Sequence, residues 1–462
     1  MKDDNKDYTP GASNKMGTMP VGRLLRDMSM PPIISMIVFA LYNIVDSIFV
    51  AKVSQDALAA VSLVFPVQML MAAINVGMGV GLASLISRRL GQGRGREAKS
   101  AAVHGFALLA CAWVAYAIFG IFLAGPFLRL FTDSPGIFGP ALVYCRCVTI
   151  GSIFFCGSVT IERILQATGN ALHPMLFNAA GALLNAGLAP VFIIGLFGAP
   201  ALGVLGAGLV AVFGQCVSCV IAVILFRRAT NEMRLSASDV RGFRFDRRIV
   251  LDVLAVGAPS IVMQSMTSFL IGALNAILIS YSDTAVAVFG VYFRVQSFIF
   301  LPLMGLHQGA LPIMGYSFGA QKRGRLVETF TLSLKIGFLI MALGTAAFWL
   351  LPEQIMRLFS ADAAMMAMGV TAMRIISISF VPSNFVILST ALFQALAHGL
   401  YAMCISIVRQ LVFLVPLAYL LSMVYGVDGV WYSFPLAEIS ALVLAAIFLR
   451  RIFKGEINRL PN

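Results

Sequence analysis

Twelve apolar runs divide the chain, and each is long enough to cross a lipid bilayer as a helix. A spanning helix needs about 20 residues to cross roughly 30 Å of hydrocarbon. Charged residues make up 11% of the 462 residues, whereas soluble domains carry about 25%. We therefore expect an all-α integral membrane protein with twelve transmembrane helices. The runs fall at residues 29–51, 57–86, 100–124, 140–161, 173–197, 203–226, 250–280, 284–313, 327–350, 366–390, 400–423 and 428–449.

The net charge of +13 comes from Lys and Arg residues that cluster between these runs. They form no basic face interleaved with aromatic residues, so we expect no nucleic-acid partner. One side of the membrane would hold about 25 of the 33 basic residues, which is the bias typical of cytoplasmic loops. That side comprises the N-terminus, residues 88–99, Arg163, residues 227–248, residues 322–325 and the C-terminal tail. Both termini are therefore expected in the cytoplasm.

An internal repeat relates the two halves of the chain at the interval between Pro31 and Pro259 (259 − 31 = 228 residues). Six helices, an even number, return the chain to its starting side, so the two copies have the same orientation. This arrangement predicts two six-helix lobes around a central cleft, a recurrent plan of secondary transporters. Further residue pairs at this interval are Gln68 and Gln296, Gly91 and Gly319, Leu130 and Leu358, Arg146 and Arg374, and Gln166 and Gln394.

The runs and the repeat predict five segments. They are a cytoplasmic N-terminal segment (1–28), an N-lobe with helices 1 to 6 (29–226), a basic cytoplasmic linker (227–249), a C-lobe with helices 7 to 12 (250–450) and a cytoplasmic tail (451–462).

Specific motifs follow the second and eighth helices. Residues 77–91 read GMGVGLASLISRRLG, and residues 305–320 read GLHQGALPIMGYSFGA. Together with YNIVDSIFV at 42–50 and Arg409 to Pro416 in the eleventh run, they resemble the multidrug and toxic compound extrusion (MATE) family. The resemblance is to its bacterial multidrug-efflux branch and covers residues 17–450.

The resemblance implies a transporter and not an enzyme. Such a protein exports amphipathic, often cationic organic compounds across the bacterial cytoplasmic membrane by alternating access, in exchange for protons or sodium. No GxxxxGK[ST] phosphate loop is present, so we expect no nucleotide partner. Cys216 and Cys219 form a CxxC without a second pair, so we expect no metal site. The expected partners are small-molecule substrates and the bilayer, without a cofactor, and we expect a monomer.

Asp46 is the candidate coupling residue. It lies about 16 residues into the first run, or roughly 24 Å from its cytoplasmic end. Ionisable residues inside a membrane span are costly and therefore mark functional sites. Asp46 also matches the helix-one Asp of the family, and Asn185 matches the helix-five Asn beside it. The alternatives are a structural carboxylate at Asp46 and a helix–helix hydrogen bond at Asn185.

The chain departs from the family pattern near this pair. Family members with a complete N-lobe cation site carry an Asp and a Thr where this chain has Ala189 and Ala211. A hard cation such as sodium needs several oxygen ligands. The departure therefore favours protons over sodium as the coupling ion, although it also leaves the proton relay with fewer members.

Glu438 is a second acid at membrane depth, in the twelfth run. It could bind a cationic substrate or form an ion pair, and we expect the pair to involve Arg146, Arg294 or Arg374. Arg409 is expected nearer the cytoplasmic side, where its side chain would extend toward the membrane surface. Glu162 and Arg163 are expected to form a surface pair at the cytoplasmic end of the fourth helix.

The substrate cavity is expected to combine amide, aromatic and thioether side chains, because thioethers adapt to many shapes. The candidates are Tyr42, Asn43, Gln68, Met69, Gln296 and Glu438.

Two other functions remain open. A flippase for a lipid-linked saccharide shares the superfamily, and its cleft would need basic residues for a pyrophosphate. A membrane enzyme would need catalytic acids, His or metal ligands clustered at membrane depth, whereas the isolated acids Asp46 and Glu438 do not make such a cluster.

Overall fold

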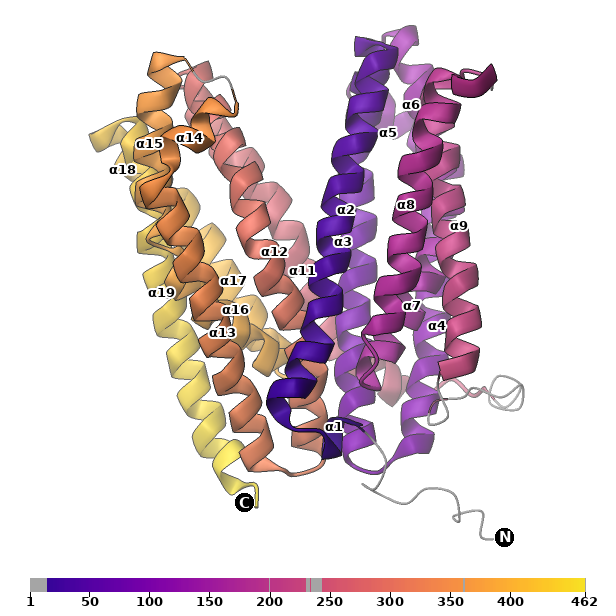
Figure 1. The fold of residues 1–462 in the computed structure, drawn as a ribbon, viewed down its shortest axis with the longest axis vertical. Coiled ribbons are helices and arrows are strands. Elements are labelled where there is room, and N and C mark those ends of the chain that lie inside the picture. Colours follow the sequence, from indigo (N-terminus) through magenta and orange to yellow (C-terminus); the bar gives the residue numbers. More distant parts are fainter. Residues whose placement is uncertain (1–14, 199, 230–232, 234–242, 360–361, 462) are drawn as a thin grey trace.

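The computed structural model describes residues 15–461 apart from 199, 230–232, 234–242 and 360–361. The side chains of residues 42–53 and 197 also lie outside that description. The described residues form helices and turns without a strand, and they gather into two bundles (Figure 1).

The first bundle follows the short helix α1 (Lys15–Thr18) and contains the N-terminal copy of the repeat. Its elements are α2 (Val21–Val53), α3 (Gln55–Gly91), α4 (Gly95–Ile118), the π-helix η2 (Phe119–Leu123), α5 (Ala124–Arg129), α6 (Pro135–Gly151), α7 (Ile153–Ala167), α8 (Leu172–Ile194), the 3₁₀ turn η3 (Leu196–Gly198) and α9 (Gly203–Ala229).

The second bundle contains the C-terminal copy. Its elements are α11 (Arg247–Ile279), α12 (Asp283–Gly319), α13 (Arg323–Leu350), α14 (Pro352–Arg357), α15 (Ala363–Ser377), α16 (Phe380–Ala395), α17 (Gly399–Ile407), the π-helix η4 (Val408–Leu414), α18 (Val415–Tyr425), α19 (Val427–Gly455) and the 3₁₀ turn η5 (Ile457–Arg459).

The expected twelve spans are present. Among the described residues, ten helices are long and apolar enough to cross a bilayer, and counting each of two bent pairs as one span gives twelve. The bent pairs are α6 with α7, at 41°, and α15 with α16, at 47°. A serine hydroxyl bonds back to the helix at each bend, from Ser152 to Thr149 O (2.6 Å) and from Ser379 to Ile376 O (2.6 Å). Such bonds compete with the backbone ladder and bend helices.

The repeat extends to local structure. The 37-residue helices α3 and α12 begin on serine caps, because Ser54 accepts a hydrogen bond from Ala57 N and Ser282 accepts one from Ala285 N. At ~1.5 Å per residue each helix is roughly 55 Å long, well beyond the hydrocarbon core. The helices therefore extend past the apolar runs, which mark only the lipid-embedded part.

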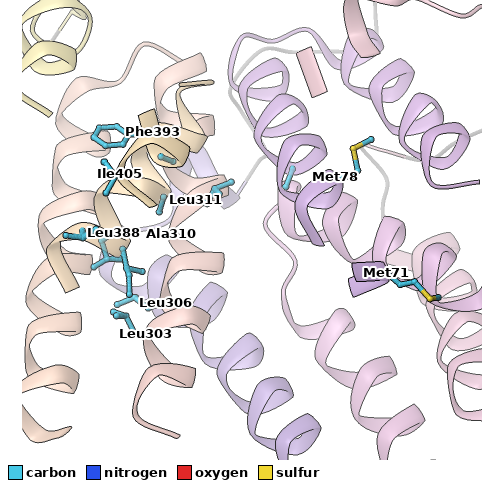
Figure 2. Packing of buried hydrophobic residues seen from close by; sticks show 14 of the residues in the cluster. Met71, Met78, Leu303, Leu306, Ala310, Leu311, Leu388, Phe393 and Ile405 are labelled. Atoms are coloured by element: carbon cyan, nitrogen blue, oxygen red, sulfur yellow. The ribbon is translucent and has the colours of Figure 1, made fainter. Parts of the chain in front are cut away.

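Each bundle has its own packed interior. In the second bundle, Leu306 and Ala310 of α12 lie beside Leu388 of α16 and Ile405 of α17 (Figure 2). Met71 of α3 is likewise buried in the first bundle. The bundles diverge toward one end and meet at the other, where α1 and the C-terminus lie (Figure 1). We call these the divergent end and the junction end.

Candidate functional site

The junction is built on glycines that the repeat places twice. A methyl group added at Gly77 would lie 2.6 Å from Cγ1 of Ile261, and one added at Gly305 would lie 2.9 Å from the backbone nitrogen of Ile33. The interval of the repeat relates Gly77 to Gly305 and Ile33 to Ile261, so the two contacts are equivalent. Two further pairs of contacts are related by the same interval. Gly81 contacts Gly257 as Gly309 contacts Ser29, and Gly91 contacts Tyr316 as Gly319 contacts Arg88.

These glycines allow the two lobes to touch backbone to backbone. A methyl group at Gly81 would lie 2.9 Å from the nitrogen of Gly257, and one at Gly309 would lie 2.7 Å from the carbonyl oxygen of Met28. A backbone atom cannot rotate away as a side chain can. Any larger residue at these positions must therefore push the lobes apart at the junction.

Polar contacts also cross the junction. The hydroxyl of Ser84 donates to the carbonyl oxygen of Gln394 at 2.5 Å, and Arg89 forms an ion pair with Asp252 at 3.2 Å. The repeat does not duplicate them, since Pro312 and Ser317 occupy the positions equivalent to Ser84 and Arg89. The junction thus combines a symmetric backbone contact with asymmetric polar bonds.

A buried polar cluster of α7 extends to this junction. Glu162 accepts hydrogen bonds from Gln166 and Asn178, both at 3.0 Å, and Arg163 donates to Gln166 at 3.0 Å and to Gln308 of the other lobe at 3.4 Å. The side chains of Glu162 and Arg163 are only 14% and 7% exposed. The two side chains do form the expected pair, at 3.8 Å, but the expected surface location was wrong because α7 turns them inward. The i, i+4 spacing of Glu162 and Gln166 was the sequence signal for the cluster.

The predicted coupling pair is described only in part. Tyr42, Asn43 and Asp46 belong to α2, but their side chains lie outside the described residues. Asn185 of α8 is 5% exposed, and its Oδ1 has no hydrogen-bond partner among the described residues. It packs on α9, since a methyl group at Gly214 would lie 3.3 Å from Cβ of Asn185. Buried polar atoms usually have a hydrogen-bond partner, so an amide oxygen without one among the described residues could accept a bond from a ligand or a protonated carboxyl.

The two predicted cavity glutamines point toward their own lobes. Gln68 donates to the hydroxyl of Tyr144 in the same bundle, at 3.3 Å. It stands nine residues before Gly77 (77 − 68), or ~2.5 helical turns, and therefore on the opposite side of α3 from the junction. Gln296 has the same relation to Gly305 on α12. Met69, in contrast, is 40% exposed. The part that Gln68, Gln296 and Met69 play in substrate binding stays a prediction.

Glu438 forms an ion pair with Arg409 instead of the three arginines that we expected. The two side chains approach to 3.5 Å, and they are 7% and 25% exposed respectively. Arg409 therefore does not extend to the membrane surface. It belongs to the π-helix η4, whose wider turn changes the direction in which its side chains point. Because the second oxygen of Glu438, Oε1, has no partner among the described residues, the pair is buried but incompletely bonded.

The three arginines that do not pair with Glu438 are all exposed. Arg146 donates from Nε to the carbonyl oxygen of Gly120, at 3.4 Å, in the π-helix η2. Arg374 is its repeat partner on α15, and Arg294 lies on α12. Among the described residues, no three His, Cys, Asp or Glu side chains lie close enough together to hold a metal ion.

Comparisons with known proteins agree with this architecture. A family model described as MatE matches residues 31–191 and 259–420, one segment in each copy of the repeat. An FAD transporter of Shewanella oneidensis is 23% identical over 436 residues, covering 94% of this chain and 95% of that protein. The multidrug export protein MepA of Staphylococcus aureus is 24% identical over 444 residues, covering 95% of each.

The fold is also similar to that of a solved structure. It is described as the outward-facing conformation of a multidrug resistance MATE family transporter of the MOP superfamily. The TM-score is 0.88 at 26% identity, over 99% of this chain and 100% of that one. The family model covers well over half of the sequence, and so the chain belongs to the MatE family of membrane transporters: it is a multi-pass transporter and not an enzyme.

Proposed function

We propose that the chain is a proton-driven antiporter that exports amphipathic organic compounds, often cationic, across the bacterial cytoplasmic membrane by alternating access. The observation that carries the proposal is the junction, where two lobes of equal orientation touch through repeat-related backbone contacts at one end of the face between them, while the bundles diverge at the other. The names of the relatives, a multidrug export protein and an FAD transporter, support small organic substrates. One chain supplies both lobes, so the proposed unit is a monomer.

The junction end is proposed to face the cytoplasm. The helix ends and loops there are basic, with Arg88, Arg89 and Arg94 in one lobe and Lys322 and Arg325 in the other. Basic loops of membrane proteins stay on the cytoplasmic side. In that orientation the divergent end opens outward, which agrees with the likeness to an outward-facing relative.

The proton is the proposed coupling ion. Asn185 offers one buried amide oxygen, and the apolar Ala189 and Ala211 occupy the nearby family positions that bind a cation elsewhere. Sodium would need several further oxygen ligands. A proton needs only one carboxyl, for which Asp46 on the adjacent helix α2 is the candidate.

Everted membrane vesicles with an imposed pH gradient test this proposal. We expect Asp46→Asn to abolish dye efflux because the amide cannot carry the proton, while Asp133→Asn, an exposed carboxylate at the outer surface, leaves efflux unchanged. Undiminished efflux by Asp46→Asn would remove Asp46 from the mechanism. Efflux driven by a sodium gradient alone would contradict proton coupling.

A further inference from the structure

Arg294 occupies an unusual place on α12. It is exposed, yet it lies eleven residues after Asp283 at the start of the helix (294 − 283), or roughly 17 Å along the axis. The opposite face of α12 is packed into the second bundle. There the ring of Phe289 lies 6.4 Å from that of Phe434, and the ring of Tyr292 lies 6.1 Å from that of Phe348.

The exposed side of α12 faces the first bundle. Gly305 stands eleven residues after Arg294 (305 − 294), or ~3 turns, and therefore on the same side of the helix. At the junction this side contacts Ile33 of α2. Closer to the divergent end, a methyl group at Gly290 would meet none of the described atoms within 4 Å. Arg294 thus lies on the part of the shared face that the lobes leave open.

Physical chemistry favours water around this guanidinium. An arginine turned to lipid at membrane depth costs several kcal/mol, whereas one beside an aqueous pathway does not. The surroundings are mixed, because Ser297 and Phe298 are exposed next to Arg294. On the first bundle the repeat partner of Arg294 is Pro66, and its exposed neighbours Phe65 and Met69 are uncharged. Of these two repeat-related positions, one therefore carries a cation and the other is uncharged.

We propose that Arg294 is a specificity-determining residue, which binds an acidic oxygen group, a carboxylate or a phosphate, on the transported compound. A guanidinium presents paired N–H donors that match such groups in a bidentate geometry. The exposed ring of Phe298, four residues further along α12 and on the same side as Gly305, receives the hydrophobic part of the same compound. The inference rests on the proposed export function and narrows its substrates to amphipathic acids and zwitterions, in which an amine accompanies the acidic group.

A pair of dyes tests this inference. One is a rhodamine with a free carboxylate and the other is its methyl ester, so the two differ only in the acidic group. Binding of each to the purified full-length chain is measured by fluorescence anisotropy. A hydrogen bond to a charged group contributes about 1.5–3 kcal/mol, so we expect the acid to bind roughly tenfold or more tightly than the ester. Arg294→Gln should remove that difference and Arg294→Lys should keep part of it.

Arg374→Gln is the matched control, because Arg374 is also exposed and lies eleven residues into its own helix (374 − 363). It should bind both dyes as the natural chain does. The inference is overturned if the natural chain binds neither dye or does not prefer the acid, or if Arg294→Gln weakens acid and ester equally. Normal dye binding without transport driven by a pH gradient would instead contradict the proposed coupling and leave the role of Arg294 intact.

Discussion

The two halves of the face between the lobes differ in kind, although the same helices build both. At the junction end, α3 and α12 present Gly81 and Gly309, and the repeat places equivalent contacts on both sides. At the divergent end, the same two helices carry Pro66 and Arg294 at repeat-related positions, and the chemistry of the two residues differs. The junction is symmetric in shape, whereas the divergent half is asymmetric in chemistry.

The difference fits the roles that we propose for the two halves, closure at the junction end and substrate recognition at the divergent end. Closure needs two surfaces that fit, and a duplicated unit supplies two fitting surfaces at once when glycine lets the backbones approach. Substrate recognition needs a charged side chain at one position, and a second copy at the repeat-related position would add nothing to it. Sequence divergence after duplication is therefore tolerated in the divergent half more readily than at Gly77, Gly81 and Gly91 or their partners.

A disulfide across the junction should have the largest effect. A methyl carbon at Gly315 would lie 3.5 Å from Cβ of Ser87, which is within the range of about 3.5–4.5 Å for a disulfide. In a chain whose native cysteines are replaced by serine, we expect oxidation of the pair Ser87→Cys and Gly315→Cys to stop efflux completely, because the junction end can no longer open. Dye efflux from vesicles before and after oxidation measures the effect.

Two controls accompany the cross-link. A reducing agent should restore efflux, and the single variant Ser87→Cys should not respond to oxidation. Efflux by the fully cross-linked chain at the rate of the reduced chain would show that the junction need not separate during transport.

The buried pair of the C-lobe should have the next largest effect, on stability. Arg409→Ala leaves the Glu438 carboxylate buried without its partner, which costs about 3–5 kcal/mol. Arg374→Ala removes an exposed arginine and should cost less than about 1 kcal/mol. Thermal unfolding of the purified variants should therefore begin several degrees lower for Arg409→Ala than for Arg374→Ala.

A second variant separates charge burial from packing. Arg409→Met combined with Glu438→Leu removes both charges and keeps apolar volume, so it should recover most of the lost stability. Equal unfolding temperatures for Arg409→Ala and Arg374→Ala would mean that the carboxylate is not buried as a charge.

The sequence predicts the fold because its strongest signals, the length of the apolar runs and the interval of the repeat, can be measured along the chain. Apolar length indicates the spans, and the interval of the repeat relates the lobes, down to the paired caps Ser54 and Ser282. The candidate site depends instead on how each helix is rotated. The π-helix η4 turns Arg409 toward Glu438, and α7 turns Arg163 inward. Residue spacing alone does not reveal such rotations, so both residues were expected at the membrane surface.

The rotation of α12 is a further feature that residue spacing alone does not reveal. In the sequence, Arg294 is one of several arginines at membrane depth, which predict structural charges, a partner for Glu438 or the basic residues of a flippase cleft. Its direction becomes clear from Gly305, which contacts the opposite lobe on the same side of the helix. A glycine that recurs in a repeat and faces a neighbouring backbone is therefore a useful marker of the interlobe face.

The central claim is that the glycine contacts hold the junction closed in this state. A methyl group at Gly309 would lie 2.7 Å from the carbonyl oxygen of Met28, and overpacking of this kind costs about 1–3 kcal/mol. Gly309→Ala should therefore shift the population toward an open junction. Gly290→Ala, on the same helix and with none of the described atoms within 4 Å of the added methyl group, should have no effect.

Distances between spin labels measure this shift most directly. One pair is placed at the exposed, repeat-related Leu130 and Leu358 near the divergent end, and the other at the exposed Arg228 and Leu400 near the junction end. Relative to Gly290→Ala, we predict that Gly309→Ala shortens the first distance and lengthens the second. Identical distance distributions in the two variants would contradict the account.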